Sequence, residues 1–361
     1  MVDDMGQIIM IQAHHKLGII VRSDNSGLGI QTRNLCKMLK PSRVLVVNSE
    51  PFNGNEQHNE WYSDYECHFT QAWPTNLECA RFMRGLTHCL TAETVYNPTI
   101  FSLARIHNVK VFIQPNWEFL DHIRDRRMPQ PTKWLMPSYW FLEEMQSMFP
   151  NTIYLPPPTS SEDFSIPRNN NLSKTGKRRF LHIMGRVASH DRNGTFDVIN
   201  ALKFSTADFE LVIRSQFPIK EYMDTAKDER ITFEISNIEN QSEIYDGFDM
   251  MIFPRRYAGL ALPMNEALMN AIPVVMSNIS PNNKILPSEW LVDAEKVDSF
   301  MARMQLDIHK TDYIYLGNKL DWFATMSDEQ LLEEKIKAYE IGFMNYSYEV
   351  LRDKYIEIME L

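Results

Sequence analysis

The sequence has no uninterrupted run of about 18 apolar residues, the length that a membrane-spanning helix needs. Its first residues, Met1-Val2-Asp3-Asp4, are acidic where a secretory signal peptide is basic. We therefore expect a protein with no membrane span and a cytoplasmic location.

Basic residues and cysteines are both scarce. The chain has 37 Lys and Arg against 47 Asp and Glu, a formal net charge of −10, which disfavours a general nucleic-acid binder and leaves open only a local basic cleft. The four cysteines lie in the first quarter of the chain without a Cys-x-x-Cys pair, so we expect reduced thiols. The spacing of Cys67, His68, His88 and Cys89 matches no common zinc motif, and we expect no metal site there.

What the sequence does contain is a regular alternation of short apolar runs and amphipathic stretches. Its 361 residues suffice for two domains, and 44% of them are hydrophobic. In the first half the pattern predicts strands at 16–22, 43–48, 92–96 and 109–114, with helices at 29–39 and 100–106. Continuous β-branched runs are typical of strands buried in a parallel sheet, so the pattern favours an α/β fold.

A second α/β series follows a break at Pro156-Pro157-Pro158. It predicts strands at 180–184, 209–213, 231–234, 250–253 and, last, 273–276, with helices at 195–202 and 263–270 and helical structure from residue 328 onward. We expect an N-terminal domain at 1–158, a linker at 159–179, a C-terminal domain at 180–335 and helices at 336–361 that pack back on the N-terminal domain. Two doubly wound Rossmann-like domains facing each other would bind ligands in the cleft between them.

One stretch carries a family resemblance. Residues 245–281 read YDGFDMMIFPRRYAGLALPMNEALMNAIPVVMSNISP, which resembles the donor-binding signature of the retaining, family-4-like glycosyltransferases of the GT-B fold (glycosyl transferases group 1). The positions in register are Pro254, Gly259, Leu262, Pro263, Glu266, Ala267, Pro273, Val274 and Val275. The segments DRNG, LPMNEAL and SPNN are similar to those of phage-encoded members of the family. A phage-encoded member would be located in the host cytoplasm.

The resemblance implies a donor site in the C-terminal domain. Glu266, expected in the first turn of a helix, would bind both ribose hydroxyls of a nucleotide sugar, with Gly259, Leu262 and Pro263 in the loop before it. Residues 180–194, FLHIMGRVASHDRNG, resemble the family's diphosphate segment, so Arg186 and Arg192 would contact the donor diphosphate. The simpler alternatives are a glutamate that favours a helix N-terminus and two surface arginines.

The N-terminal domain resembles the family more weakly. Asp24-Asn25-Ser26-Gly27-Leu28-Gly29 follows the first predicted strand, and the resemblance implies that Gly27 and Gly29 form a loop facing the diphosphate. Asp24, Asn116 and Glu118 are the candidate catalytic residues on the acceptor side, because they follow predicted strands at the ligand-binding edge of the sheet. Loop capping and turn chemistry are the alternative for all of them.

The sequence departs from the family at informative positions. The family places two glutamates eight positions apart; the second is Glu266, but Ala258 stands at the first, which puts the donor-sugar contacts in doubt. Arg192-Asn193-Gly194 replaces the usual Lys-Gly, and no His ends a predicted N-terminal strand. Arginine supplies the same charge with a different geometry.

We therefore expect a glycosyltransferase that moves a sugar from a nucleotide-sugar donor to a hydroxyl-bearing acceptor. A UDP-sugar is the favoured donor. The resemblance implies that the anomeric configuration is retained, and we expect no metal ion to be required. The acceptor could be a small molecule, a glycan, a protein or modified DNA. Two alternatives stay open. A phage-type enzyme would glycosylate a hydroxymethylated DNA base, to which the basic residues 124–127 would contribute. A catalytically silent GT-B-like module would bind the nucleotide sugar without turnover.

Overall fold

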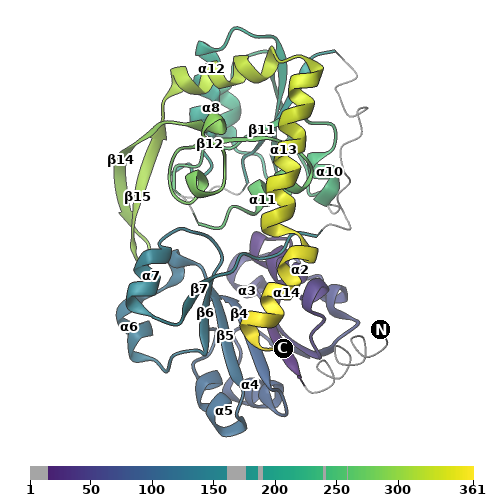
Figure 1. The fold of residues 1–361 in the computed structure, drawn as a ribbon, viewed down its shortest axis with the longest axis vertical. Coiled ribbons are helices and arrows are strands. Elements are labelled where there is room, and N and C mark those ends of the chain that lie inside the picture. Colours follow the sequence, from purple (N-terminus) through teal and green to yellow (C-terminus); the bar gives the residue numbers. More distant parts are fainter. Residues whose placement is uncertain (1–14, 161–175, 186–189, 239–240, 258) are drawn as a thin grey trace, which may run out of the picture. The chain divides into compact units, whose positions relative to one another are not determined.

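The computed structural model describes residues 15–160, 176–185, 190–238, 241–257 and 259–361. The chain divides into two compact units, Met1–Thr159 with Tyr348–Leu361, and Ser160–Ser347 (Figure 1). The domain boundary expected at 335/336 falls inside one continuous helix, α13 (Asp328–Tyr346), and the second unit ends with that helix. Most of the linker expected at 159–179 lies outside the described residues.

The N-terminal unit is built on a seven-stranded sheet whose paired strands are all parallel. Its order is β3-β2-β1-β4-β5-β6-β7, with β1 Leu17–Arg22, β2 Arg43–Val47, β3 Glu66–Phe69, β4 His88–Glu93, β5 Lys110–Pro115, β6 Lys133–Met136 and β7 Thr152–Tyr154. The strand predicted at 92–96 is β4, which begins and ends earlier. The prediction missed its first half because His88 and Thr91 are polar, although both are buried in the sheet. The other three predicted strands lie within a residue of their expected positions.

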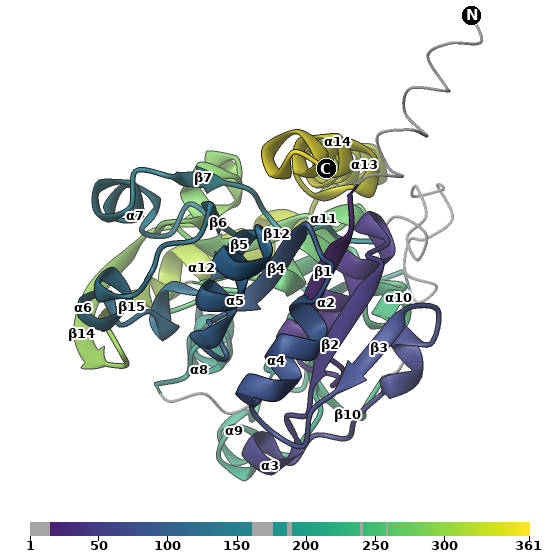
Figure 2. The ribbon, with the colours of Figure 1, turned by 90° about the horizontal axis from the view of Figure 1, so that it is seen from below.

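Helices cover both faces of this sheet. They are α2 Gly27–Leu39, α3 Glu50–Asn53, α4 Asn76–Met83, α5 Thr99–His107, α6 His122–Arg127, α7 Leu142–Met148 and α14 Tyr348–Met359, with short 3-10 turns η1 Asn59–Tyr62 and η2 Trp117–Phe119. Residues of α2 and α14 share a core with Ile19, whereas the neighbouring Gly18 meets Phe82 of α4 on the opposite face. Helices α4 and α5 lie side by side (Figure 2).

The second unit contains a six-stranded parallel sheet and a separate hairpin. The sheet order is β10-β9-β8-β11-β12-β13, with β8 Arg178–Ile183, β9 Phe209–Ser215, β10 Ile231–Ile235, β11 Met250–Ile252, β12 Val274–Ser277 and β13 Leu291–Val292. The strand expected to be last, β12, is followed by β13 and by the antiparallel pair β14 (Ala294–Met301) and β15 (Gln305–Thr311), so that expectation was wrong. The hairpin is largely exposed and lacks the apolar runs that predicted the other strands.

The helices of the second unit connect and cover this sheet. They are α8 Thr195–Ala201, η3 Leu202–Phe204, α9 Lys220–Thr225, α10 Gln241–Tyr245, α11 Leu262–Met269, η4 Asn282–Lys284, η5 Ser288–Trp290, α12 Tyr313–Ala324 and α13. Helix α13 runs along α11 (Figure 1). A Cβ at Gly342 of α13 would lie 2.7 Å from the Leu268 carbonyl carbon, so glycine permits this close approach.

A buried ion pair holds α13 to the start of β11. The Lys335 ammonium donates to the Phe248 carbonyl at 2.9 Å and lies 3.4 Å from Oδ1 of Asp249. Oδ2 of Asp249 accepts a hydrogen bond from the Arg179 backbone at 2.9 Å. Because α13 also packs on α11, which contacts β12, these contacts fix α11 against the sheet.

Candidate functional site

The sheet of the second unit reverses its strand order between β8 and β11. From β8 the chain adds β9 and β10 on one side, and then β11, β12 and β13 on the other. In open parallel sheets the carboxyl ends of the strands at such a reversal form the usual ligand site. The two segments that carry the family resemblance, 180–194 and 245–281, contain most of β8, all of β11 and the loops that follow these strands.

The loop after β8 has an unusual backbone conformation. Gly185, His190, Asp191 and Gly194 all have positive φ, at 68°, 64°, 51° and 72°. Gly194 has a second constraint, since a Cβ there would lie 2.2 Å from the carbonyl oxygen of Pro254, just after β11. The backbone of Arg256 donates to the Arg192 carbonyl at 3.0 Å. The two segments are therefore in direct contact, and glycine is required where they meet.

Several arginines gather around these two loops. The Arg192 guanidinium lies 5.5 Å from the Tyr257 ring centroid. The Arg256 side chain donates to the His309 carbonyl at 3.0 Å, and the buried Arg255 side chain donates to the Leu260 carbonyl at 3.1 Å. Arg255 and Arg256 follow the end of β11 after two intervening residues, at the ligand-binding edge of the sheet, which is a signal that the sequence interpretation missed. Arg186 and Ala258 lie outside the described residues.

The first amides of α8 are already bound by a carboxylate of the chain itself. Asp191 accepts hydrogen bonds from the backbone of Thr195 at 3.0 Å and of Phe196 at 2.9 Å, and from the Tyr222 hydroxyl at 2.8 Å. Burial raises the pKa of Asp191 above its usual value. Since Asp191 occupies these two amides, arginine side chains are the stronger candidates for holding a diphosphate here.

Glu266 lies deeper than the sequence predicted. It is the fifth residue of α11, in the second turn, because the helix begins at Leu262 with Pro263 in its first turn. The expectation of a first-turn position was therefore wrong, and so is the alternative that Glu266 merely favours a helix N-terminus. The side chain is buried and accepts a hydrogen bond from the Tyr245 hydroxyl at 2.6 Å. Burial raises its pKa to about 7. Gly259 and Leu262 are also buried on this segment.

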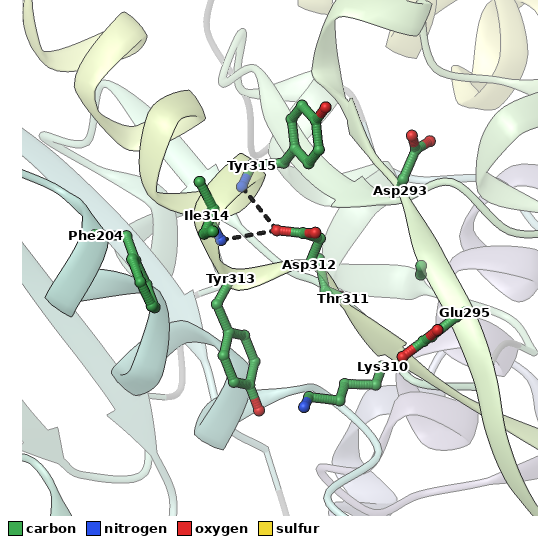
Figure 3. A pocket seen from close by; sticks show the side chains of 10 residues that line it. Phe204, Asp293, Glu295, Lys310, Thr311, Asp312, Tyr313, Ile314 and Tyr315 are labelled. Atoms are coloured by element: carbon green, nitrogen blue, oxygen red, sulfur yellow. Dashed lines mark hydrogen bonds between the residues drawn. The ribbon is translucent and has the colours of Figure 1, made fainter.

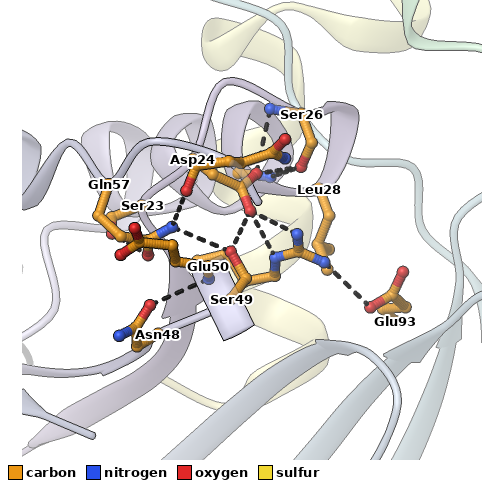
Figure 4. Close-up of polar contacts among 12 residues, drawn as sticks. Ser23, Asp24, Ser26, Leu28, Asn48, Ser49, Glu50, Gln57 and Glu93 are labelled. Atoms are coloured by element: carbon orange, nitrogen blue, oxygen red, sulfur yellow. Dashed lines mark hydrogen bonds and ion pairs between the residues drawn. The ribbon is translucent and has the colours of Figure 1, made fainter. Parts of the chain in front are cut away.

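The sheet of the N-terminal unit has its own reversal, between β1 and β4, and Asp24 follows β1 there. Asp24 is fully buried. Its Oδ1 accepts from the backbone and hydroxyl of Ser26, and its Oδ2 from the Arg22 guanidinium and the Ser49 hydroxyl (Figure 4). Burial opposes ionisation, but Arg22 and the two serine hydroxyls outweigh it and lower the pKa of Asp24 to about 2. These contacts show Asp24 organising the loop.

The glycines of this loop begin helix α2. Gly27 is its first residue, and the Ser26 hydroxyl caps it by accepting from the Gly29 backbone at 3.4 Å. A Cβ at Gly29 would lie 1.8 Å from the Asp24 carbonyl oxygen, so the loop folds back on the helix only with glycine there.

Glu93, at the end of β4, joins Asp24 to Asn116. The Arg22 guanidinium that pairs with Asp24 also lies 3.9 Å from the Glu93 carboxylate (Figure 4). The Glu93 carbonyl accepts from the Asn116 backbone at 3.1 Å, and the φ of Glu93 is 67°, a conformation uncommon outside glycine and often found at functional sites. The sequence did not predict a role for Glu93, because no residue pattern around it indicates its positive φ.

Asn116 and Glu118 follow β5, the next strand of the sheet. The side-chain oxygen of Asn116 is buried and has no hydrogen-bond partner among the described residues. Glu118 is partly buried in the 3-10 turn η2. The structure therefore brings all three sequence-predicted acceptor-side residues to one edge of the sheet. Asp24 follows β1, Asn116 and Glu118 follow β5, and β4 lies between these two strands.

Within the described parts of the chain there is no group of three or more His, Cys, Asp or Glu side chains arranged to hold a metal ion. The same residues include no helix long and apolar enough to cross a membrane. The four cysteines are free thiols.

No family model and no curated protein matches this sequence. Solved structures do match, over 96% of the chain. A glycosyltransferase from Rickettsia africae ESF-5 superposes with a TM-score of 0.71 at 12% identity, covering 96% of this chain and 98% of its own. HepE (Alr3699) from Anabaena, solved with UDP and glucose, gives 0.70 at 9% identity, covering 96% and 100%. The chain has the GT-B fold.

Other GT-B structures agree. Sucrose-phosphate synthase from Thermosynechococcus elongatus has a TM-score of 0.68 at 12% identity, with 96% of this chain and 98% of that chain covered. The expected fold class, two doubly wound Rossmann-like domains of the GT-B type, is confirmed in its two parallel sheets. At these identities the likeness concerns the fold, so activity has to be argued from the site.

Proposed function

We propose that this protein is a glycosyltransferase that moves a sugar from a nucleotide sugar to a hydroxyl-bearing acceptor. The observation that carries the proposal is the buried Glu266 carboxylate, bound by Tyr245, on the segment that follows β11 at the strand reversal of a GT-B fold. A buried acid with a raised pKa and a specific hydrogen-bond donor, here Tyr245, is a candidate for a functional site. Burying a carboxylate costs free energy, and ligand hydroxyls that bond to Glu266 would offset part of that cost.

The donor would bind the second unit. The Glu266 carboxylate accepts the two ribose hydroxyls, and Arg192, together with Arg186, contacts the diphosphate. A UDP-sugar is the favoured donor, since HepE was solved with UDP and with UDP-glucose. Gly259 in the loop, and Leu262 and Pro263 in the first turn of α11, would shape the approach of the nucleotide to Glu266.

In the reaction the bond between the sugar's anomeric carbon and the diphosphate oxygen breaks, and a bond to the acceptor oxygen forms. The departing diphosphate gains negative charge, which the arginine side chains would stabilise without a metal ion. Resemblance to the family favours retention of configuration. In the N-terminal unit Asn116 would hold the acceptor hydroxyl, Glu118 would accept its proton, and Asp24 would position the first turn of α2, which contains Gly27 and Gly29.

A thermal-shift panel with UDP, GDP, ADP and UDP-glucose, with and without a chelator, tests the donor site, since a ligand that binds only the folded state raises the melting temperature. We expect a selective rise that the chelator leaves unchanged and that Glu266→Gln strongly reduces. Glu333→Gln, the same change at an exposed position of α13, is the matched control. Release of the nucleoside diphosphate from the donor then measures turnover. If the protein binds the nucleotide sugar but releases no nucleoside diphosphate with every acceptor tested, the catalytically silent module would be supported instead.

A further inference from the structure

A pocket of about 540 Å³ lies within the second unit, on elements that the proposed reaction does not use. It is formed by the base of the β14–β15 hairpin, the first turn of α12 and the turn η3. Figure 3 shows the side chains around it. Its volume falls in the range of about 300–1,000 Å³ that is typical of small-molecule sites.

Aromatic rings form much of the wall. The Phe204 side chain is 45% exposed and that of Tyr315 is 58% exposed, although both are large and apolar. Tyr313 adds a third ring, and its hydroxyl donates to the Asp197 carboxylate at 3.3 Å, which fixes its orientation. Aromatic faces left open around one hollow are suited to a ligand that has a flat apolar face of its own.

The remaining wall offers both donors and acceptors. Glu295 of β14 lies directly opposite Lys310 of β15 (Figure 3). The Lys310 ammonium lies 4.6 Å from the Tyr313 ring centroid. Among the described residues the Glu295 carboxylate has no hydrogen-bond or ion-pair partner, whereas Asp312 is already bound to the backbone of α12 and Asp293 to Asn278. Glu295 and Lys310 are thus the polar groups available to a ligand.

These charges select the class of ligand. Three carboxylates against one ammonium repel phosphates and other anions. An organic cation would have to compete with Lys310, which already occupies the face of Tyr313. A neutral polyhydroxyl ligand meets neither obstacle, because each hydroxyl both donates to a carboxylate and accepts from an ammonium.

We propose that this pocket is a carbohydrate-binding site for a neutral oligosaccharide, distinct from the nucleotide-sugar site. The C–H face of a pyranose ring packs on Tyr315 and Phe204, and its hydroxyls bond to Glu295 and Lys310. Such a site would retain a glycan chain on the enzyme independently of donor binding, and it does not depend on the proposed transfer reaction.

Saturation-transfer NMR of the full chain with maltotriose, cellotriose and lactose tests this site. We expect at least one of them to bind, to remain bound in the presence of excess UDP, and to lose about tenfold in affinity in Tyr315→Ala and in Glu295→Gln. Ile106→Ala, which removes an exposed apolar side chain of the other unit, and Glu333→Gln are the controls that should leave sugar affinity unchanged.

Three outcomes would overturn the proposal: no binding by any of the three sugars, binding that UDP displaces, or binding that both pocket variants leave intact. Spermidine that binds in place of the sugars and is lost in Glu295→Gln would instead assign the pocket to cations. Because Tyr315 and Glu295 are exposed, the variants should fold, and their unchanged UDP affinity would separate a failure here from a failure of the donor site.

Discussion

The hydroxyl of Tyr245 donates a 2.6 Å hydrogen bond to Oε2 of Glu266, and both side chains are buried. Burial raises the pKa of Tyr245 well above its usual value, so the phenol stays protonated and remains a donor. The bond lowers the pKa of Glu266 against the larger effect of burial, which raises it to about 7. Tyr245 therefore both orients the carboxylate and helps it to ionise.

Nucleotide affinity should depend on pH through Glu266. Accepting two ribose hydroxyls requires the carboxylate form, so affinity should rise as pH increases through about 7. Tyr245→Phe removes a hydrogen bond to the ionised Glu266 carboxylate. It should therefore move the midpoint of the rise in UDP affinity to higher pH and weaken UDP binding about tenfold at pH 7. Calorimetric titration between pH 5.5 and 8.5 measures both. Tyr339→Phe on α13 is the control, and a midpoint that Tyr245→Phe leaves in place would rule out this role for Tyr245.

Stability should change with pH in the opposite sense. The unfolded carboxyl has its ordinary pKa of 4.5 and the folded one about 7, so the folded state holds an extra proton between these values. Stability from this group is lost as pH rises through that window, and the loss amounts to about 3 kcal/mol. Glu266→Gln cannot ionise and should therefore be more stable than the natural protein at pH 8, with a smaller difference at pH 4.5. Urea denaturation of both proteins at pH 8 and pH 4.5 measures their free energies of unfolding. The same stability difference between them at the two pH values would contradict the prediction.

Asp24→Asn should destabilise the N-terminal unit. The substitution removes the nearer of two carboxylates beside the largely buried Arg22 guanidinium and leaves Glu93, 3.9 Å away, which costs about 3 kcal/mol. In the natural protein the pKa of Asp24 is lowered from 3.8 to about 2, so its contribution is present above pH 3.8 and is lost as pH falls toward 2. Urea denaturation at pH 7 measures the effect. The exposed Asp353→Asn on α14 of the same unit should change stability by less than about 0.5 kcal/mol.

Gly194→Ala separates the two constraints on this glycine. Gly194 and Gly54 have nearly the same φ, 72° and 67°, but a Cβ at Gly54 meets nothing within 4 Å, whereas one at Gly194 would lie 2.2 Å from the Pro254 carbonyl oxygen. Gly54→Ala should cost about 1 kcal/mol for its backbone conformation alone. Gly194→Ala should cost about 3 kcal/mol or more and should also weaken UDP binding, because the two donor loops separate. Equal costs for the two variants would show that the close approach is unimportant.

The sequence predicted the fold where apolar runs determine it. The run LGIIVR forms β1 and FELVI lies within β9, because such continuous apolar segments are stable only inside a covered sheet. The β14–β15 hairpin could not be predicted in this way. Most of β14 is exposed, so its residues AEKVDSFM show neither an apolar run nor a clean alternation.

The candidate site was predictable only in its local parts. Arg192 and Gly194 were predicted from one contiguous motif and Glu266 from another. Tyr245 lies 21 positions before Glu266, and nothing in that spacing shows that α10 and α11 bring their side chains together. The depth of Glu266 in α11 also escaped prediction, since Leu262 begins the helix one residue earlier than expected and burial depends on the packing of the distant α13.

The most direct test of the proposed donor site compares UDP with a UDP analogue whose ribose lacks the 2′ and 3′ hydroxyls. Calorimetry would measure the affinities of UDP and 2′,3′-dideoxy-UDP for the natural protein and for Glu266→Gln. If Glu266 binds the ribose diol, the natural protein prefers UDP by tenfold or more, and Glu266→Gln loses most of that preference while affinity for the dideoxy nucleotide changes little. The same preference in both proteins, or no UDP binding by the natural protein, would contradict the assignment of Glu266 to the donor.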